Sequence, residues 1–226
     1  MSKTVLITLD NTSGDYLVQF SKKYTLDKNV HLTVPRGYVA IAFINGKALF
    51  KQSQCVEEKV LAKTGKEFAG KEIQFAFYSP NFHPEISYGF GPIHVKNDKL
   101  KETYRIGING KMVLTIKDYV QLINYFSFSD SITVEDVRER LLPTIKSVGI
   151  PIVSSLFVDS NVSVFEVNAM IGDIRENMSK AFITENALEN LGIQVDSVTI
   201  NEVYVNEEDL ELIRNRINNS TDQIGG

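Results

Sequence analysis

Residues 88–118 read YGFGPIHVKNDKLKETYRIGINGKMVLTIKD, and this stretch decides the fold. Six apolar residues in its second half alternate with polar or small ones: Tyr104, Ile106, Ile108, Met112, Leu114 and Ile116. Asn109-Gly110 lies inside the run, and this dipeptide favours a type I′ turn because both central positions of that turn need positive φ. The pattern therefore predicts an antiparallel hairpin over residues 104–116 with Asn109-Gly110 at its tip. A Gly-Pro corner and a short apolar strand are expected before it.

The rest of the first 120 residues also alternates with a period of two, which is typical of strands. The predicted strands are residues 5–9, 17–20, 38–44, 47–51 and 72–78. Asn45-Gly46 predicts the turn of another hairpin, between the third and fourth of these strands. Residues 52–71 are polar and rich in Lys and Glu, so we expect a loop there with at most a ragged strand.

After Asp118 the apolar spacing becomes helical. Residues 119–126 predict a short helix. A second helix is expected over residues 133–148, with Thr133 as its N-cap. Pro143 lies inside that pattern, and we expect it to kink or end the helix because it lacks a backbone N–H.

The longest helix is predicted over residues 163–191. It begins with a Ser163–Glu166 capping box and stops at Gly192. A strand follows over residues 193–200, with a bulge where the apolar parity shifts. The sequence ends with a short helix after Asn206, and residues 218–226 are expected to be a disordered tail.

Strands thus come first, helices second, and one strand returns near the end. This order predicts an α+β fold, with largely antiparallel strands followed by helices and a returning strand. Strict alternation of strands and helices is absent, which argues against a doubly wound parallel sheet.

Three segments resemble the SPFH superfamily, also called Band 7, of stomatins, prohibitins and flotillins. They are VPRGYVA at residues 34–40, FGPIHV at residues 90–95 followed by YRIGINGKMVLTIKD, and LENLGIQVDSVTINEV at residues 188–203. The likeness covers roughly residues 34–217 and is similar to the anchorless cytosolic branch, whose members include proteins labelled "virion core". It implies an SPFH-like domain at 34–217, made of a strand-rich half (34–120) and a helix-rich half (121–217), after N-terminal strands at 1–33.

The resemblance implies a non-enzymatic scaffold that self-associates, or that docks on a membrane-associated partner complex. Two other classes stay open. One is an enzyme that binds a small molecule or metal at a site without a recognised motif, and the other is a structural protein of a phage or virus-like particle. A deep pocket with convergent polar groups, for example with His83 facing His94, would favour the enzyme.

The composition argues against certain classes of binding partner and cellular location. The formal net charge is −4 and the pI is near 5.5, which argues against a nucleic-acid-binding surface. No run approaches the ~20 consecutive apolar residues of a membrane span, so we expect a cytoplasmic protein that inserts into no membrane directly. The single cysteine, Cys55, has no histidine beside it in the sequence and is expected to be structural.

No catalytic, cofactor-binding or metal-binding residue is predicted. His31, His83 and His94 are scattered, and none has a Cys, Asp or Glu at metal-ligand spacing. The carboxylates of residues 207–209 begin a helix, where acids commonly complement the helix dipole in solvent. Several aromatic residues are expected in the core, with an interface as the alternative for any exposed group: Phe77, Tyr78, Phe82, Phe90, Phe126 and Phe128.

Overall fold

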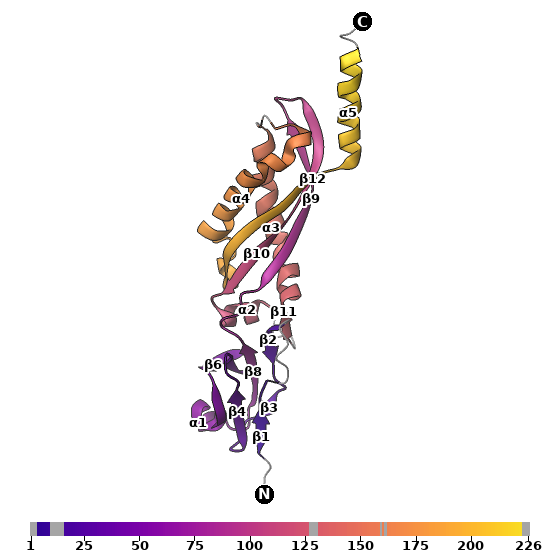
Figure 1. The fold of residues 1–226 in the computed structure, drawn as a ribbon. Coiled ribbons are helices and arrows are strands. Elements are labelled where there is room, and N and C mark those ends of the chain that lie inside the picture. Colours follow the sequence, from indigo (N-terminus) through magenta and orange to yellow (C-terminus); the bar gives the residue numbers. More distant parts are fainter. Residues whose placement is uncertain (1–3, 10–15, 127–130, 159, 161, 223–226) are drawn as a thin grey trace. The chain divides into compact units, whose positions relative to one another are not determined.

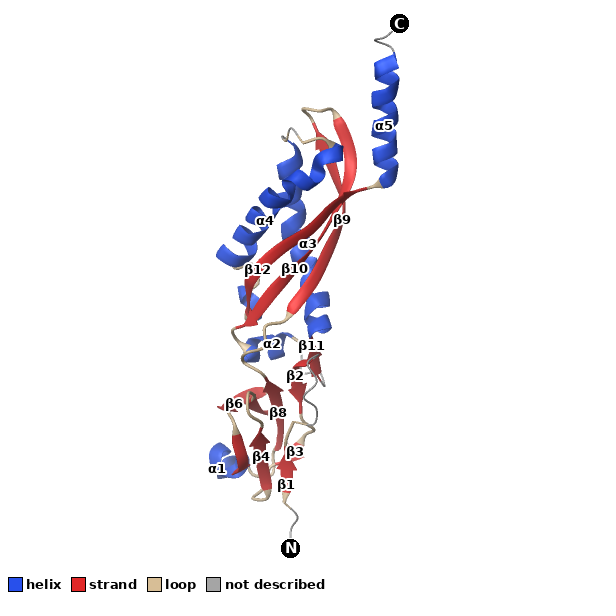
Figure 2. Cartoon of the chain, viewed as in Figure 1, coloured by secondary structure: helices blue, strands red, loops and turns tan. Residues whose placement is uncertain are grey.

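The computed structural model describes residues 4–9, 16–126, 131–158, 160 and 162–222, and its α+β architecture is the predicted one (Figures 1 and 2). The strands are β1 Val5–Ile7, β2 Tyr16–Phe20, β3 Tyr24–Thr25, β4 Val30–Val34, β5 Val39–Ile44, β6 Lys47–Gln52, β7 Cys55–Lys59, β8 Glu72–Tyr78, β9 Glu85–Asn97, β10 Glu102–Ile116, β11 Ser131–Thr133 and β12 Ile193–Val205. The helices are α1 Val60–Thr64, α2 Tyr119–Tyr125, α3 Val134–Val158, α4 Ile171–Ser179 and α5 Glu207–Asp222, with shorter turns η1 Lys66–Phe68, η2 Val164–Met170, η3 Lys180–Thr184 and η4 Glu189–Leu191.

The chain divides into two compact units. Unit 1 consists of residues 1–84, 115–137 and 191–193, and unit 2 of residues 85–114, 138–190 and 194–226. The division therefore runs through β10, α3 and β12. It differs from the expected split near residue 120, because the long strands β9 and β10 group with the helices rather than with the earlier strands.

Unit 1 is built from two sheets with a shared core. One sheet has the order β1-β4-β7, and the other has the order β11-β2-β8-β5-β6, with β3 also paired to β8. The alternate residues of β4, β5 and β8 point into one cluster: Val30, Leu32, Val34, Ala40, Ala42, Ile44, Ile73, Phe75 and Phe77. Because strand side chains alternate between faces, this parity shows that the two sheets pack face to face.

The second predicted hairpin is confirmed in unit 1. Asn45 and Gly46 have φ angles of 51° and 74° between β5 and β6, as a type I′ turn requires. The expectation of a loop with at most a ragged strand at residues 52–71 holds for β7, whose pairing with β4 shifts register, and is wrong for α1 and η1. The surface of this stretch is mostly exposed, so its polar composition concealed the short helices.

The hairpin predicted at Asn109-Gly110 is wrong. Residues 102–116 form one continuous strand, β10, which pairs antiparallel with the whole length of β9 in the three-stranded sheet β12-β10-β9 of unit 2. The turn of this hairpin lies at residues 98–101 instead. β9 is also longer than predicted, since it runs through the Gly91-Pro92 corner, which has a cis peptide bond.

The parity of the apolar residues explains this error. A two-residue turn at Asn109-Gly110 would pair Ile108 with Lys111, and it would put Met112 on the opposite face from Ile108. In the structure the even-numbered residues of β10 stay on one buried face through Gly110. A Cβ at Gly110 would clash with the Thr199 carbonyl oxygen of β12, so glycine is required there for close approach and not for a turn.

α3 packs on this sheet in unit 2. A set of residues spaced by four is buried along the helix: Leu141, Ile145, Gly149, Val153 and Phe157. The Phe157 ring meets Tyr104 of β10 edge-on at 6.5 Å, and a Cβ on Gly149 would press against Phe90 of β9. α4 closes the same cluster through Met178, whose sulfur lies 3.3 Å from that Cβ position.

The expected start of α3 is confirmed and its expected end is not. Thr133 Oγ1 accepts from the Asp136 N–H at 3.1 Å, and Asp136 Oδ2 accepts from the Thr133 N–H at 2.8 Å, which is a reciprocal cap. The helix continues through Pro143 and Pro151 to Val158. Of the described helices, α3 is the one that is long and apolar enough to cross a membrane, a test that helices of soluble cores also pass. Charged and polar residues interrupt its apolar residues, so the sequence pattern did not identify α3 as long and apolar enough to cross a membrane.

The long helix predicted over residues 163–191 is interrupted. Ser163 caps the start by accepting from the Phe165 N–H at 3.4 Å, but Glu166 leaves helical geometry, so a 3₁₀ segment precedes α4. A π-helical turn, Lys180–Thr184, follows α4, and the continuous helix stops there. A separate 3₁₀ turn, Glu189–Leu191, precedes Gly192, which has the positive φ (70°) expected of the predicted stop. Most of the predicted stripe, including Ile174 and Phe182, is buried as expected.

β12 and α5 end the described chain. The buried residues of β12 switch parity between Val195 and Val198, as predicted. Thr199 lies beside Lys111 and Asn206 beside Arg105, so β12 runs antiparallel to β10. α5 continues to Asp222, so the predicted disordered tail is wrong for residues 218–222, and residues 223–226 lie outside the described part.

Candidate functional site

The three histidines do not form a site with one another. His83 Nδ1 lies 2.8 Å from Thr115 Oγ1 in unit 1, whereas His94 is exposed on β9 of unit 2. His31 is half-buried in β4, and its Nδ1 has no hydrogen-bond partner among the described residues. Within the described residues, no group of three or more His, Cys, Asp or Glu side chains is placed to hold a metal ion.

The aromatic residues and the cysteine singled out in the sequence do not gather at one site. Phe77, Tyr78 and Phe90 are buried, and Phe82 and Phe126 are half-buried, while Phe128 lies outside the described residues. Cys55 is half-buried on β7, with its sulfur 3.5 Å from the Leu32 carbonyl oxygen. These positions fit packing roles.

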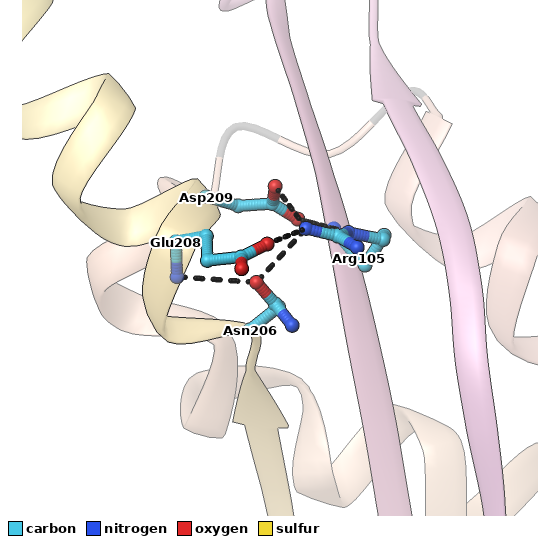
Figure 3. Close-up of polar contacts among 4 residues, drawn as sticks. All are labelled: Arg105, Asn206, Glu208 and Asp209. Carbon is cyan, nitrogen blue, oxygen red and sulfur yellow. Dashed lines mark hydrogen bonds and ion pairs between the residues drawn. The ribbon is translucent and has the colours of Figure 1, made fainter.

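Asp209 departs from the expected solvated surface. Its carboxylate accepts from Arg105 Nε at 2.9 Å through Oδ2 and from Arg105 Nη2 at 2.9 Å through Oδ1. The Arg105 backbone N–H also donates to Oδ2, at 2.7 Å. Figure 3 shows the guanidinium of Arg105, a residue of β10, directed at Asp209 and Glu208 at the start of α5. A two-point contact of this kind fixes orientation as well as distance.

Asn206 and Glu208 complete this anchor. Asn206 Oδ1 accepts from the Glu208 N–H at 3.1 Å as the helix cap, and it also accepts from Arg105 Nη2 at 3.0 Å. Glu208 Oε2 accepts from the same Nη2 at 3.0 Å. The Asn206 N–H donates to the Arg105 carbonyl oxygen at 2.9 Å. Arg105 therefore holds the first turn of α5 through both its backbone and its side chain.

The anchor is partly withdrawn from solvent. The Asp209 side chain is 13% exposed and that of Arg105 is 32% exposed, whereas Glu208 is 78% exposed. Hydrogen bonds from Arg105 hold the pKa of Asp209 below its ordinary value, although burial acts in the opposite direction. The same bonds, from Asp209 first and Glu208 second, raise the pKa of Arg105. The pair therefore stays ionised around neutral pH.

Beyond this first turn, Ile213 is the one buried residue among the described side chains of α5, and residues 214–218 are all exposed. Ile213 is 4% exposed, whereas Leu212 is 64% exposed. The Arg214 guanidinium lies over the Phe165 ring of η2, 5.9 Å from its centroid. A helix held firmly at its start thus presents two large apolar side chains to solvent, Leu212 and Ile217, the latter 49% exposed.

Sequence reasoning missed the anchor. Arg105 and Asp209 are 104 positions apart, and no local spacing connects them. The available signal was an arginine at an outward position of an apolar strand, and this signal does not identify its partner. Glu207–Asp209 were correctly placed at a helix start, but the burial of one of the three followed only from the fold.

Hollows in the surface of unit 1 bear on the alternative that the protein is an enzyme. One of about 330 Å³ is lined by polar Lys23, Glu72 and Gln74 together with Phe43 and Ile73. Neither His83 nor His94 lines it. Its polar groups include no histidine or cysteine, and they do not form a recognisable nucleophile–base pair.

No protein-family model matches the sequence, and no curated protein matches it either.

Proposed function

We propose that this protein is a non-enzymatic, SPFH-like scaffold that self-associates through the solvent side of α5. The observation that carries this proposal is the combination of a firmly anchored helix start and an exposed Leu212 one turn later. An anchored helix loses little further conformational freedom when it pairs, which favours association.

The charge sequence of α5 supports a second copy of the chain as the occupant. Residues 207–211 contain four acids, Glu207, Glu208, Asp209 and Glu211, and two bases follow at Arg214 and Arg216. If two α5 helices pair antiparallel about Leu212, the acidic half of each lies against the basic half of the other. Two-fold contacts require this kind of self-complementarity.

The helical spacing agrees with such a pair. Glu208, Leu212 and Arg216 are four residues apart, so they lie on one face of α5. A two-fold axis at Leu212 would place the two leucines in contact and each Glu208, which also accepts from Arg105 of its own chain, near the partner's Arg216. The apolar contact would supply most of the free energy, because exposed ion pairs contribute little.

Light scattering after size-exclusion chromatography tests the proposal. Wild-type protein is expected to give a mass above that of one chain, which is 25.4 kDa. Leu212→Glu is expected to shift the mass towards the monomer. Asn218→Glu adds the same charge about 120° around the helix and should leave the mass unchanged. A wild-type monomer at every concentration, or equal effects of the two variants, would refute self-association through this side of α5.

A further inference from the structure

A second hollow in unit 1 has a different chemical character. It has a volume of about 350 Å³ and is lined by Lys28, Lys59, Leu61, Ala62, Gly65 and Lys66. Lys28 comes from the turn before β4 and the other five from the continuous stretch 59–66, which ends β7 and forms α1 and the start of η1, so two segments of the chain meet there. We call it the lysine hollow. Its volume is within the range of small-molecule pockets, which begins at roughly 300 Å³.

The floor of the lysine hollow is apolar. Leu61 and Ala62 contribute aliphatic side chains, and Gly65 contributes backbone only. None of the lining side chains carries a carboxylate, an amide or a hydroxyl group. A sugar or a nucleobase would therefore leave its hydrogen-bond donors without side-chain acceptors, at a cost in free energy. An alkyl chain has no such groups, and burying it is favourable.

The rim is cationic. None of Lys28, Lys59 and Lys66 forms an ion pair with a residue that the structure describes. Lys63 in α1 is different, because it is paired with Glu58 at 3.5 Å and hydrogen-bonded to Gln52. Glu67 follows Lys66 in the chain, and its carboxylate fills the space over Gly65 that a Cβ would need. Asp27 and Glu58 adjoin Lys28 and Lys59 in the chain, but Asp27 accepts from Asn29 and Glu58 pairs with Lys63.

We propose that the lysine hollow binds a single-chain anionic amphiphile, of which a medium-chain fatty carboxylate is the simplest. The alkyl chain would lie on Leu61 and Ala62 and on the aliphatic stems of the lysines. The carboxylate would lie among the three ammonium groups. This site is independent of α5, which belongs to unit 2.

The test uses sodium dodecanoate below its micelle concentration and the full chain, with binding measured by titration calorimetry. Wild-type protein is expected to bind one dodecanoate saturably. The variant with Lys28→Gln, Lys59→Gln and Lys66→Gln is expected to bind at least about tenfold more weakly, because three favourable charge interactions are lost. A matched variant with Lys22→Gln, Lys47→Gln and Lys51→Gln has the same net charge and should bind as the wild type does.

Further variants separate the chain from the head group. Ala62→Glu puts a charge on the exposed floor and is expected to abolish binding, whereas Glu67→Gln is expected to strengthen it. Dodecyl maltoside, which has the same chain and a neutral head, should bind at least about tenfold more weakly than dodecanoate. Circular dichroism of each variant establishes that it is folded.

Several results would overturn the proposal: equal weakening in the two triple-lysine variants, binding unaffected by either, or equal affinity for the neutral amphiphile. A membrane is the other source of anionic head groups. If the protein sediments with phosphatidylglycerol vesicles through these lysines but does not bind monomeric dodecanoate, the hollow is a membrane-surface patch and the proposal is wrong.

Discussion

Arg105 and Asp209, which lie 104 residues apart, form a two-point ion pair with both N···O distances at 2.9 Å. The pair connects the outward face of β10 to the first turn of α5. Because the Arg105 backbone also bonds to Asp209 and Asn206, the start of α5 is fixed to the sheet of unit 2. The anchor fixes the orientation of α5 relative to the sheet of unit 2. A surface that pairs with a second copy of the chain would need its side chains held in such a fixed orientation.

Removing one partner of the anchor should loosen α5. Asp209→Asn keeps the shape of the side chain but removes its charge, so we expect faster backbone hydrogen exchange throughout α5 and little change in β9. Arg105→Lys should have a similar effect, because an ammonium group cannot make the two-point contact. Unchanged exchange in α5 in both variants would show that the ion pair does not hold the helix.

The anchor should also depend on pH in one direction. The folded pKa of Asp209 lies below its ordinary value of 3.8, so its contribution to stability is fully present above 3.8. The contribution is lost as the pH falls through the lowered folded value. We therefore expect wild type and Asp209→Asn to differ in α5 protection at neutral pH and to converge once the pH falls below the lowered pKa of Asp209. A difference that grows on acidification would contradict this assignment.

Gly110 should tolerate no side chain, and Gly89 should. A Cβ at Gly110 would clash with the Thr199 carbonyl oxygen and would lie 2.6 Å from the Tyr88 hydroxyl, whereas a Cβ at Gly89 would have its nearest neighbour at 3.5 Å. Gly110→Ala is expected to lower the free energy of unfolding by about 1–3 kcal/mol, as overpacking typically does. Gly89→Ala should change it little. Chemical denaturation measures both.

The hydroxyls of Tyr88 and Tyr104 provide a second matched pair. Tyr88 donates to the Thr199 carbonyl oxygen at 3.0 Å, whereas the buried Tyr104 hydroxyl makes no hydrogen bond of ordinary geometry to a described residue, although the Asn97 side chain lies near enough to lower its pKa. Burial raises the pKa of Tyr104 to about 12 and also raises that of Tyr88. Tyr88→Phe is expected to cost about 1 kcal/mol of stability and Tyr104→Phe to cost nothing. Equal costs would mean that the hydrogen bond from Tyr88 makes no net contribution to the free energy of unfolding.

The sequence predicted the elements better than their connections. Thr133 and Ser163 were identified as helix starts because capping is local, and Asn45-Gly46 as a turn because it separates two strands of suitable parity. Asn109-Gly110 misled us because the same dipeptide also occurs where backbones approach closely. The Arg105–Asp209 anchor and the lysine hollow join segments far apart in the chain, and local patterns carry no information on such pairs.

Hydrogen exchange of α5 at two protein concentrations tests the central claim most directly. If α5 pairs with α5 of a second chain, amides around Leu212 should exchange more slowly in concentrated than in dilute wild-type protein. The concentration effect should be absent in Leu212→Glu and retained in Asn218→Glu. Exchange in α5 that is independent of concentration in a protein shown to be oligomeric would contradict the account, because the contact would then lie elsewhere.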